Sequence, residues 1–162
     1  MALPAETPKA EIEINDALVR QLIHDQHPDF SHLSILRFEE GWDNVLYRLG
    51  NQYVIRLPRR QIGAELIQNE ITWLPMVAQD VQYATPQPVR IGQPQREYPW
   101  SWVIVPWIEG VSADLSPPQR YEVDGFVQFL KTIHQPAPDE APENATRGIS
   151  LSAKAKDIGS RM

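Results

Sequence analysis

The sequence of 162 residues contains no cysteine, which excludes disulfide bonds and thiolate metal sites. Basic residues are also scarce: 15 Lys and Arg face 21 Asp and Glu, for a net charge of −6. A general nucleic-acid binder needs a basic face, so this composition disfavours that class. No apolar run reaches membrane-spanning length, and no basic segment followed by an apolar one opens the chain. We therefore expect a cytoplasmic protein with neither nucleic acid nor membrane as partner.

Metal-binding patterns are missing as well. The four histidines (His24, His27, His32 and His134) share no metal-ligand spacing, so we expect no metal site from them. What is present is ordinary for a soluble globular protein: 42% hydrophobic and 22% charged residues. The length allows one domain, or one and a fraction. Residues 1–12 hold two prolines and little apolar material, which predicts a disordered arm.

The first half of the chain reads as one helix and three strands. Ile14, Leu18 and Leu22 recur at helical spacing; Asn15 or Asp16 can cap this helix and Pro28 ends it. Strands are predicted over 33–38, 45–49 and 52–57. The dipeptide Gly50-Asn51 between the last two is typical of a tight hairpin, because both residue types tolerate a positive φ.

The second half begins with a helix predicted over 62–77, and Pro75 should bend or end it. Short extended pieces follow over 86–99, and the apolar run 102–107 predicts a central strand. Ser116-Pro117-Pro118-Gln119 favours a helix start, with Ser116 as the cap and Gln119 reaching back. The helix would run to about His134. The residues expected on one side of the first of these helices are Leu66, Ile67, Trp73, Leu74 and Val77; those forming the apolar face of the second are Val123, Phe126, Val127, Leu130 and Ile133.

Arg56 is the first residue of chemical interest. On an extended strand Tyr53, Ile55 and Leu57 share one face, whereas Val54 and Arg56 share the other. The second face could support an adenine on Val54, with its phosphates running past Arg56. Read alone, the same pattern also fits a solvent-facing arginine on a half-exposed strand.

Glu70 falls within the apolar stripe of the 62–77 helix, three residues after Ile67 and three before Trp73. A carboxylate there needs a partner, since burying an unpaired charge costs several kcal/mol. Arg56 is the nearest inward-pointing strand cation, and arginine can hold a carboxylate through two hydrogen bonds. The alternative is that Glu70 sits at the edge of the stripe and reaches water.

Two loops complete the set. The turn Gly41-Trp42-Asp43-Asn44 could present backbone N–H groups to an anion, although an ordinary hairpin turn has the same pattern. Pro106-Trp107-Ile108-Glu109-Gly110 leaves the apolar strand, where the Pro106 carbonyl and the Ile108 N–H could meet the edge of an adenine. A plain turn with glycine at a positive φ is the alternative.

In combination, these residues resemble the amino-terminal lobe of the aminoglycoside phosphotransferase family, which shares the protein-kinase-like fold. The resemblance covers about residues 33–151. It is carried by Glu39-Glu40-Gly41-Trp42-Asp43-Asn44, Val54-Ile55-Arg56-Leu57-Pro58-Arg59, Glu70-x-x-Trp73-Leu74-Pro75 and Tyr98-Pro99-Trp100 to Gly110, and more loosely by the stretch Phe129 to His134 and by Arg147-Gly148.

The resemblance implies roles for these positions. Arg56 takes the place of the strand lysine that orders the α- and β-phosphates, and Glu70 that of its helix partner. Leu46 and Val54 would line the adenine slot, the turn at 41–44 would cover the phosphates, and residues 106–108 would form the hinge. ATP or GTP with Mg²⁺ and a small-molecule hydroxyl acceptor are the implied ligands. Arginine in place of lysine would hold phosphate differently, and the covering turn lacks the several glycines of protein kinases.

One expected part is missing. Such kinases need a His-x-Asp loop with a following asparagine and a further aspartate for Mg²⁺. Nothing after Gly110 supplies these residues; Asp114, Asp124, Asp139 and Asp157 are not in that pattern. We therefore assign no catalytic residue, expect the chain to be inactive alone, and interpret it as a truncated form of a kinase roughly twice as long.

The resulting hypothesis is an α+β protein with a five-stranded antiparallel sheet. Residues 13–110 would form the nucleotide-binding lobe with its hinge at 106–110, and 111–162 the truncated start of a carboxyl-terminal lobe. The helix at 116–134 would then expose its apolar face, which predicts self-association. The competing hypothesis is a non-catalytic module that binds a nucleotide or a protein partner.

Overall fold

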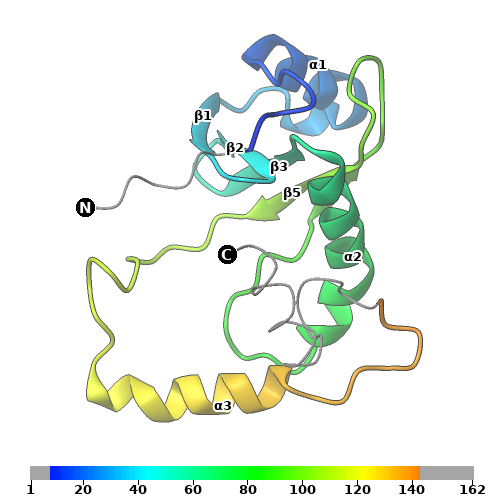
Figure 1. Ribbon diagram of the computed structural model, residues 1–162. Helices are drawn as coiled ribbons and strands as arrows, with labels where there is room; N and C mark the ends of the chain where they lie inside the picture. The colour runs from blue at the N-terminus through cyan, green and yellow to red at the C-terminus, as the bar shows by residue number, and fades with distance from the viewer. Residues whose placement is uncertain (1–7, 143–162) are drawn as a thin grey trace, which may run out of the picture.

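The computed structural model describes residues 8–142 and shows a twisted sheet with one helix on each face and a third helix below it (Figure 1). The elements, in chain order, are α1 (Asp16–Gln26), η1 (Pro28–Phe30), β1 (Ile35–Glu40), β2 (Asn44–Leu49), β3 (Tyr53–Pro58), α2 (Gln61–Val77), β4 (Arg90–Gly92), β5 (Trp102–Pro106), η2 (Arg120–Glu122) and α3 (Val123–Ile133). No helix among these residues is long and apolar enough to cross a membrane.

The sheet has the strand order β1-β2-β3-β5-β4, and every neighbouring pair is antiparallel. This confirms the five-stranded antiparallel sheet predicted from the sequence. Gly50 has a φ of +56° in the β2–β3 turn, the conformation for which the Gly50-Asn51 dipeptide was expected. The strand predicted over 33–38 begins two residues later, because Leu33 and Ser34 complete the turn that leaves η1.

The alternation along the strands divides the hydrophobic core in two. Ile55 and Leu57 of β3 pack with Val19, Leu22 and Ile23 of α1 on one face of the sheet. On the other face a smaller cluster joins Val54, Val103 and Val105 to Ile67 of α2. The face of the sheet that carries Arg56 is therefore only partly covered by helix.

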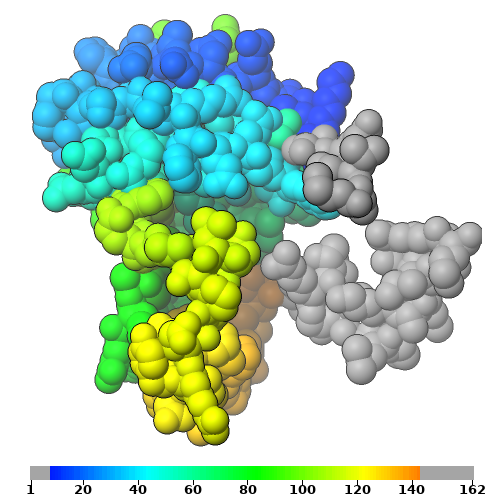
Figure 2. Space-filling model, turned by 90° about the vertical axis from the view of Figure 1, so that its left-hand side faces the viewer, coloured from blue at the N-terminus to red at the C-terminus, as the bar shows by residue number. Residues whose placement is uncertain are grey.

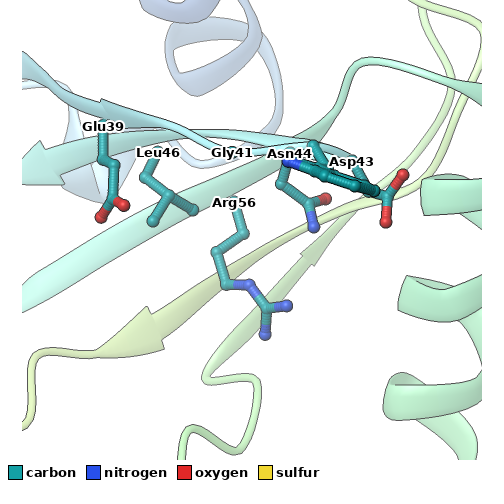
Figure 3. Close-up of a pocket in the computed structure, with 7 residues that line it drawn as sticks. Glu39, Gly41, Asp43, Asn44, Leu46 and Arg56 are labelled. Atoms are coloured by element: carbon teal, nitrogen blue, oxygen red, sulfur yellow. The ribbon is translucent and has the colours of Figure 1, made fainter. Parts of the chain in front are cut away.

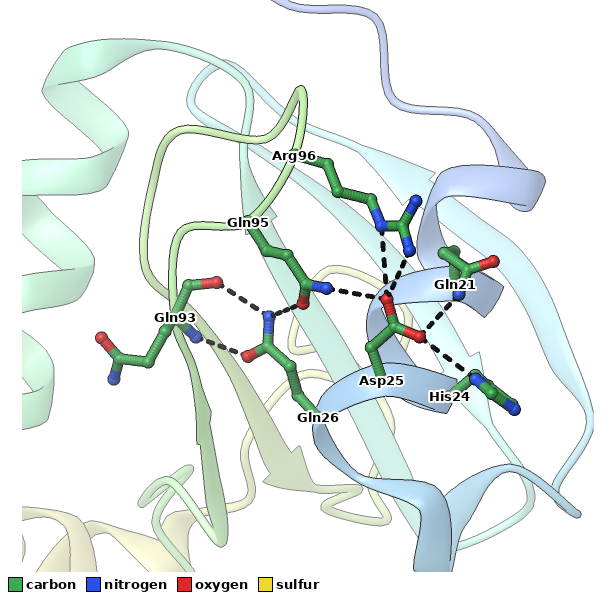
Figure 4. Close-up of polar contacts among 7 residues, drawn as sticks. All are labelled: Gln21, His24, Asp25, Gln26, Gln93, Gln95 and Arg96. Atoms are coloured by element: carbon green, nitrogen blue, oxygen red, sulfur yellow. Dashed lines mark hydrogen bonds and ion pairs between the residues drawn. The ribbon is translucent and has the colours of Figure 1, made fainter.

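The end of α1 is fastened to the β4–β5 connection by a polar network (Figure 4). Asp25 accepts hydrogen bonds from Gln95 at 2.7 Å and Arg96 at 3.1 Å. Gln26 bonds both backbone groups of Gln93, at 2.7 and 3.0 Å. The hydrogen bond with His24, together with those from Gln21 and Arg96, lowers the pKa of the Asp25 carboxyl, so the network is held by an ionised side chain.

Helix α2 differs from its predicted packing. Leu66 and Val77, which were expected on its buried side, are exposed, and only Gly63 and Ile67 of the helix are buried. The prediction was wrong there because α2 meets the sheet mainly through Ile67 and Ile71, which pack on the valines of β3 and β5. Pro75 is inside the helix, which ends two residues later at Val77.

The start of α3 also corrects the sequence interpretation. Ser116 does not cap the helix; a 3-10 turn begins at Arg120, and Gln119 forms the capping box with Glu122. Pro118 disfavours helical dihedrals at Pro117, and residues 117–119 are outside any helix, so the helix starts later than predicted. The first part of the apolar face of α3 is exposed as expected, with Phe126 60% exposed, whereas Leu130 and Ile133 are half-buried. In Figure 2 the yellow helix α3 stands below the blue and cyan body of the sheet.

The expectation of a disordered arm over residues 1–12 is wrong for its last residues. The Glu11 N–H donates to the Arg59 carbonyl at 2.9 Å, the Glu11 carboxylate accepts from the Gln61 N–H at 3.0 Å, and Ile12 packs on the larger core. These contacts to the β3–α2 junction could not be predicted, because no sequence pattern marks them. Residues 1–7 of the arm, and 143–162 of the carboxyl-terminal segment, lie outside the described residues.

Candidate functional site

The structure brings Arg56 and Glu70 together. Arg56 leaves β3 on the face opposite the larger core, and Glu70 lies on α2 one turn after the buried Ile67. The guanidinium donates two hydrogen bonds to the carboxylate, at 2.6 and 3.1 Å. The two side chains are 20% and 35% exposed, so the pair is partly shielded from solvent but remains open to a ligand. Such a bidentate pair fixes the direction of the arginine.

The turn from Gly41 to Asn44 connects β1 and β2 above this pair. The Gly41 N–H donates to the Asn44 carbonyl at 2.9 Å, which closes the turn. The Asn44 side-chain oxygen is buried and has no hydrogen-bond partner in the described part of the chain. An unsatisfied acceptor at this place favours a donor from water or a ligand, since buried polar groups are normally paired.

A pocket of about 290 Å³ lies between the turn and Arg56 (Figure 3). Its volume is at the lower end of the range for small-molecule sites. Seven residues line it: Glu39, Gly41, Trp42, Asp43, Asn44, Leu46 and Arg56. Six of these were predicted from the sequence, and Figure 3 shows the side chains of Glu39, Leu46 and Arg56 on the same side of the sheet.

Glu39 was missed because of a β-bulge. The register between β1 and β2 shifts between Arg37 and Glu39, so Glu39 pairs with Leu46, which in turn pairs with Arg56. Strict alternation would have placed Glu39 with Arg37 on the opposite face. A bulge adds one residue to one strand, and nothing in this stretch of the sequence marks its position.

Val54 lies beside the pocket, not in it. It is 7% exposed and packs with Val103, Val105 and Ile67, while Leu46 and Trp107 cover the same cluster. Leu46 therefore touches both the pocket and this apolar patch. The Trp107 ring is itself covered, by the Arg48 guanidinium at 3.7 Å from its centre and by the edge of Phe38 at 5.4 Å between ring centres. Phe38 and Arg48 were not singled out from the sequence.

The predicted hinge follows β5. The Trp107 N–H donates to the Gln52 carbonyl at 2.7 Å, and the Ile104 carbonyl accepts from the Val89 N–H at 2.8 Å on the opposite edge. Because polar backbone groups alternate along a strand, the Pro106 carbonyl points to the same side as that of Ile104, where β4 no longer runs alongside. The Ile108 N–H makes no backbone hydrogen bond in the described part of the chain. Both groups predicted to meet a base thus lack a partner strand.

The charges around the pocket are mixed. Arg56 is paired with Glu70, and Asp43 is paired with Arg60 at 3.2 Å, while Glu39 adds a further carboxylate. The two ion pairs cancel, and Glu39 leaves the pocket with one net negative charge. Over residues 8–142 there is no group of three or more His, Asp or Glu side chains that could hold a metal ion.

Comparison with known proteins gives the family. The sequence matches the phosphotransferase enzyme family over residues 34–156. No curated protein matches the chain. A GDP complex of wild-type aminoglycoside 2'-phosphotransferase-IIIa superposes with a TM-score of 0.62 at 25% identity, covering 74% of this chain and 40% of that one.

Other solved structures share the fold at lower identity. A gentamicin complex of APH(2")-IIa has a TM-score of 0.60 at 16% identity, over 93% of this chain and 50% of that one. ADP-bound APH(2'')-Ib has a TM-score of 0.55 at 15% identity, over 91% of this chain and 49% of that one. The chain thus spans two fifths to half the length of these proteins, and its sheet and helices have the kinase-like fold of their amino-terminal lobes. Because the family match covers most of its residues, the chain belongs to the phosphotransferase enzyme family.

Proposed function

We propose that residues 13–110 bind a nucleoside triphosphate and form the nucleotide-binding lobe of an ATP- or GTP-dependent phosphotransferase that acts on a small-molecule hydroxyl. The observation that carries this proposal is the bidentate Arg56–Glu70 pair beneath the Gly41–Asn44 turn, in a pocket open to ligand. A guanidinium held in one direction by a carboxylate, below a turn whose Trp42 and Asp43 N–H groups make no hydrogen bond to the described residues, suits a row of phosphates.

Each part has a defined task in this proposal. Arg56 orients the phosphates, and Glu70 holds Arg56 in place. The turn covers the phosphates, and the free acceptor of Asn44 can take a donor from the ligand or from water bound with it. The base would lie along Leu46 and the patch around Val54, with its edge at the Pro106 carbonyl and the Ile108 N–H.

The solved relatives support a nucleotide as the ligand, since they include complexes with GDP, ADP and ATP. One GDP complex also contains kanamycin, and another structure is a complex with gentamicin. These ligands are those of the relatives. For this chain we propose a small-molecule hydroxyl as the acceptor class and do not restrict it to aminoglycosides.

Phosphoryl transfer is not expected from these 162 residues alone. The sequence after Gly110 holds no His-x-Asp pattern and none of the further aspartates in the expected spacing. Transfer needs a group that orients the acceptor and charges that stabilise the transferring phosphoryl group. Binding without turnover is therefore the expected behaviour of this chain.

Isothermal titration calorimetry with ATP and GTP, each with and without Mg²⁺, tests the proposal. We expect saturable binding of at least one of them, and no release of ADP, GDP or phosphate in a coupled assay with aminoglycosides, sugars or choline as acceptors. Absence of binding to either nucleotide would refute the proposal. Binding with turnover would retain the nucleotide site but refute the expected inactivity.

The alternative is a non-catalytic module that recognises a protein through the same surface. The net negative charge of the pocket, its exposed lining residue Trp42 and the exposed Phe38 favour it. The same titrations separate the two functions, because a protein-binding module would leave both nucleotides unbound.

A further inference from the structure

Arg59 is the most deeply buried charged side chain among residues 8–142, with 6% of its surface exposed. It follows Pro58 at the end of β3, three residues after Arg56. Its guanidinium lies beside Arg37 and Val45, which belong to the opposite side of the sheet from the candidate site. Burying a guanidinium is costly unless it is paired and hydrogen-bonded, so this position calls for an explanation.

The contacts of Arg59 converge on the turn that lines the pocket. Its Nη1 donates to the Gly41 carbonyl at 3.1 Å and pairs with the Glu40 carboxylate at 2.6 Å. Its backbone N–H donates to the Asp43 carbonyl at 2.9 Å. One residue therefore holds the first and third residues of the turn, and the strand residue before it.

The start of α2 holds the same turn from the other side. The Arg60 side chain pairs with the Asp43 carboxylate at 3.2 Å. A Cβ on Gly63 would lie 2.5 Å from the Asp43 carbonyl oxygen, so helix and turn touch through backbone atoms. The turn is thus clamped between a buried arginine and a helix that approaches closely.

We infer that Arg59 is a positioning residue, which fixes the shape of the Gly41–Asn44 turn and so the arrangement of the groups that face the phosphates. The inference rests on the proposed function, because it takes the turn as the part of the site that covers the phosphates. Arg59 does not line the pocket. It bonds the carbonyls of Gly41 and Asp43 from the opposite side of the sheet. Without the guanidinium, the Gly41 carbonyl and the Glu40 carboxylate would lose a charged donor, and the turn would sample other shapes even though the backbone bond from residue 59 to Asp43 remains.

This role predicts different effects on the affinities for ATP and for adenosine. The turn meets the phosphates, whereas the base would lie along Leu46 and the hinge. Loosening the turn should therefore weaken ATP and leave adenosine unchanged. A general loss of structure would weaken both alike.

The chain offers a matched control in Arg37. This arginine pairs with the same Glu40 carboxylate and lines the same cavity of about 200 Å³ as Arg59, but its other hydrogen bond goes to the Ile14 carbonyl. Replacing it removes one arginine from Glu40 without removing a contact to the turn.

The experiment compares Arg59→Gln and Arg37→Gln with the wild type, by amide hydrogen exchange and by calorimetry with ATP and adenosine. In Arg59→Gln we expect the Gly41 amide to exchange at least about tenfold faster and ATP to bind about tenfold more weakly, with adenosine unchanged. Arg37→Gln should alter neither. Arg59→Lys, which keeps the charge but not the planar fork, should lie between wild type and Arg59→Gln.

The two readouts separate this inference from the function on which it rests. Equal exchange at Gly41 in the wild type and Arg59→Gln would overturn the positioning role, as would an equal loss of ATP and adenosine affinity. If the wild type binds no nucleotide, the proposed function fails, and the exchange of Gly41 still decides whether Arg59 holds the turn. If Arg59→Gln does not fold, the same comparison is made with Arg59→Lys.

Discussion

Arg56 and Arg59 lie three residues apart and face opposite sides of the sheet, and each is held by a carboxylate from another element. Arg56 meets Glu70 of α2, and Arg59 meets Glu40 of β1. The first pair could be predicted, because both residues break an otherwise apolar pattern. The second could not, since Glu40 lies beyond a bulge and Arg59 follows a proline where alternation no longer applies.

Replacing Arg56 with alanine should weaken ATP binding by about 10- to 100-fold, the effect expected from losing a charge-assisted bidentate contact. Arg56→Lys should retain part of the affinity, because it keeps the charge but not the fork. Calorimetry measures both. Arg90→Ala, which removes an arginine that pairs with Asp29 at the edge of the sheet, is the control and should bind ATP as the wild type does.

His27 makes the stability of the fold depend on pH. It is buried against the edge of Trp102, with 5.3 Å between ring centres, and burial lowers the pKa of its imidazole below 6.5, with a smaller lowering from Arg90 and an opposing effect of Asp29. The folded state therefore favours neutral His27, and its contribution is present above pH 6.5 and is lost as the pH falls.

Thermal unfolding at pH 7.5 and pH 5.5 checks this dependence. The midpoint of the wild type should fall on acidification more than that of His27→Gln, which carries no titrating group at this position. An equal fall in both proteins would show that the other histidines or the carboxylates dominate in this range.

At the scale of elements, the turn between β1 and β2 depends on what lies behind and beside it. The sequence identified the turn, because Gly41, Asp43 and Asn44 interrupt two apolar runs. The contacts that hold the turn could not be predicted, because they join residues far apart in the sequence. They depend on the bulge in β1, the close approach of Gly63 and the hydrogen bond from Arg59. Likewise, the prolines at 117 and 118 delay the helix, so that Gln119 and not Ser116 is the cap.

Gly63→Ala tests the contact between α2 and the turn. Its Cβ would collide with a backbone oxygen that cannot rotate away, which should destabilise the fold by about 1–3 kcal/mol. The gain of about 1 kcal/mol from alanine in a helix offsets part of this cost. Urea unfolding measures the net effect. Gly110→Ala, where a Cβ meets nothing within 4 Å, should change the stability little; equal effects would contradict the close contact.

At the scale of the molecule, the sheet with its two helices accounts for nearly all of the buried core, and α3 contributes no buried residue. Helix α3 touches the segment after α2 through Tyr83 and Phe129, whose ring centres lie 5.8 Å apart. The presence of the strands and helices was predictable, because each has the apolar period of its type. The position of α3 was not predictable. Its sequence has a strong helical pattern, but the helix makes few contacts with the rest of the protein that could fix its place.

The exposed face of α3 predicts self-association of this chain in solution. Sedimentation velocity from about 1 to 100 μM should show oligomers that increase with concentration. Phe126→Ser should reduce them, whereas Leu36→Ser, which removes an exposed apolar side chain from β1, should not. A monomer throughout this range would contradict the prediction.

The most direct test of the account is the location of the bound nucleotide. Titration of the isotopically labelled protein with ATP, followed by backbone amide NMR, should shift the resonances of residues 41–46, 54–56 and 107–108 and leave those of α1 unchanged. Shifts confined to the α1 face of the sheet, or none at saturating ATP, would contradict the claim that Arg56, Glu70 and the turn above them form a phosphate-binding site.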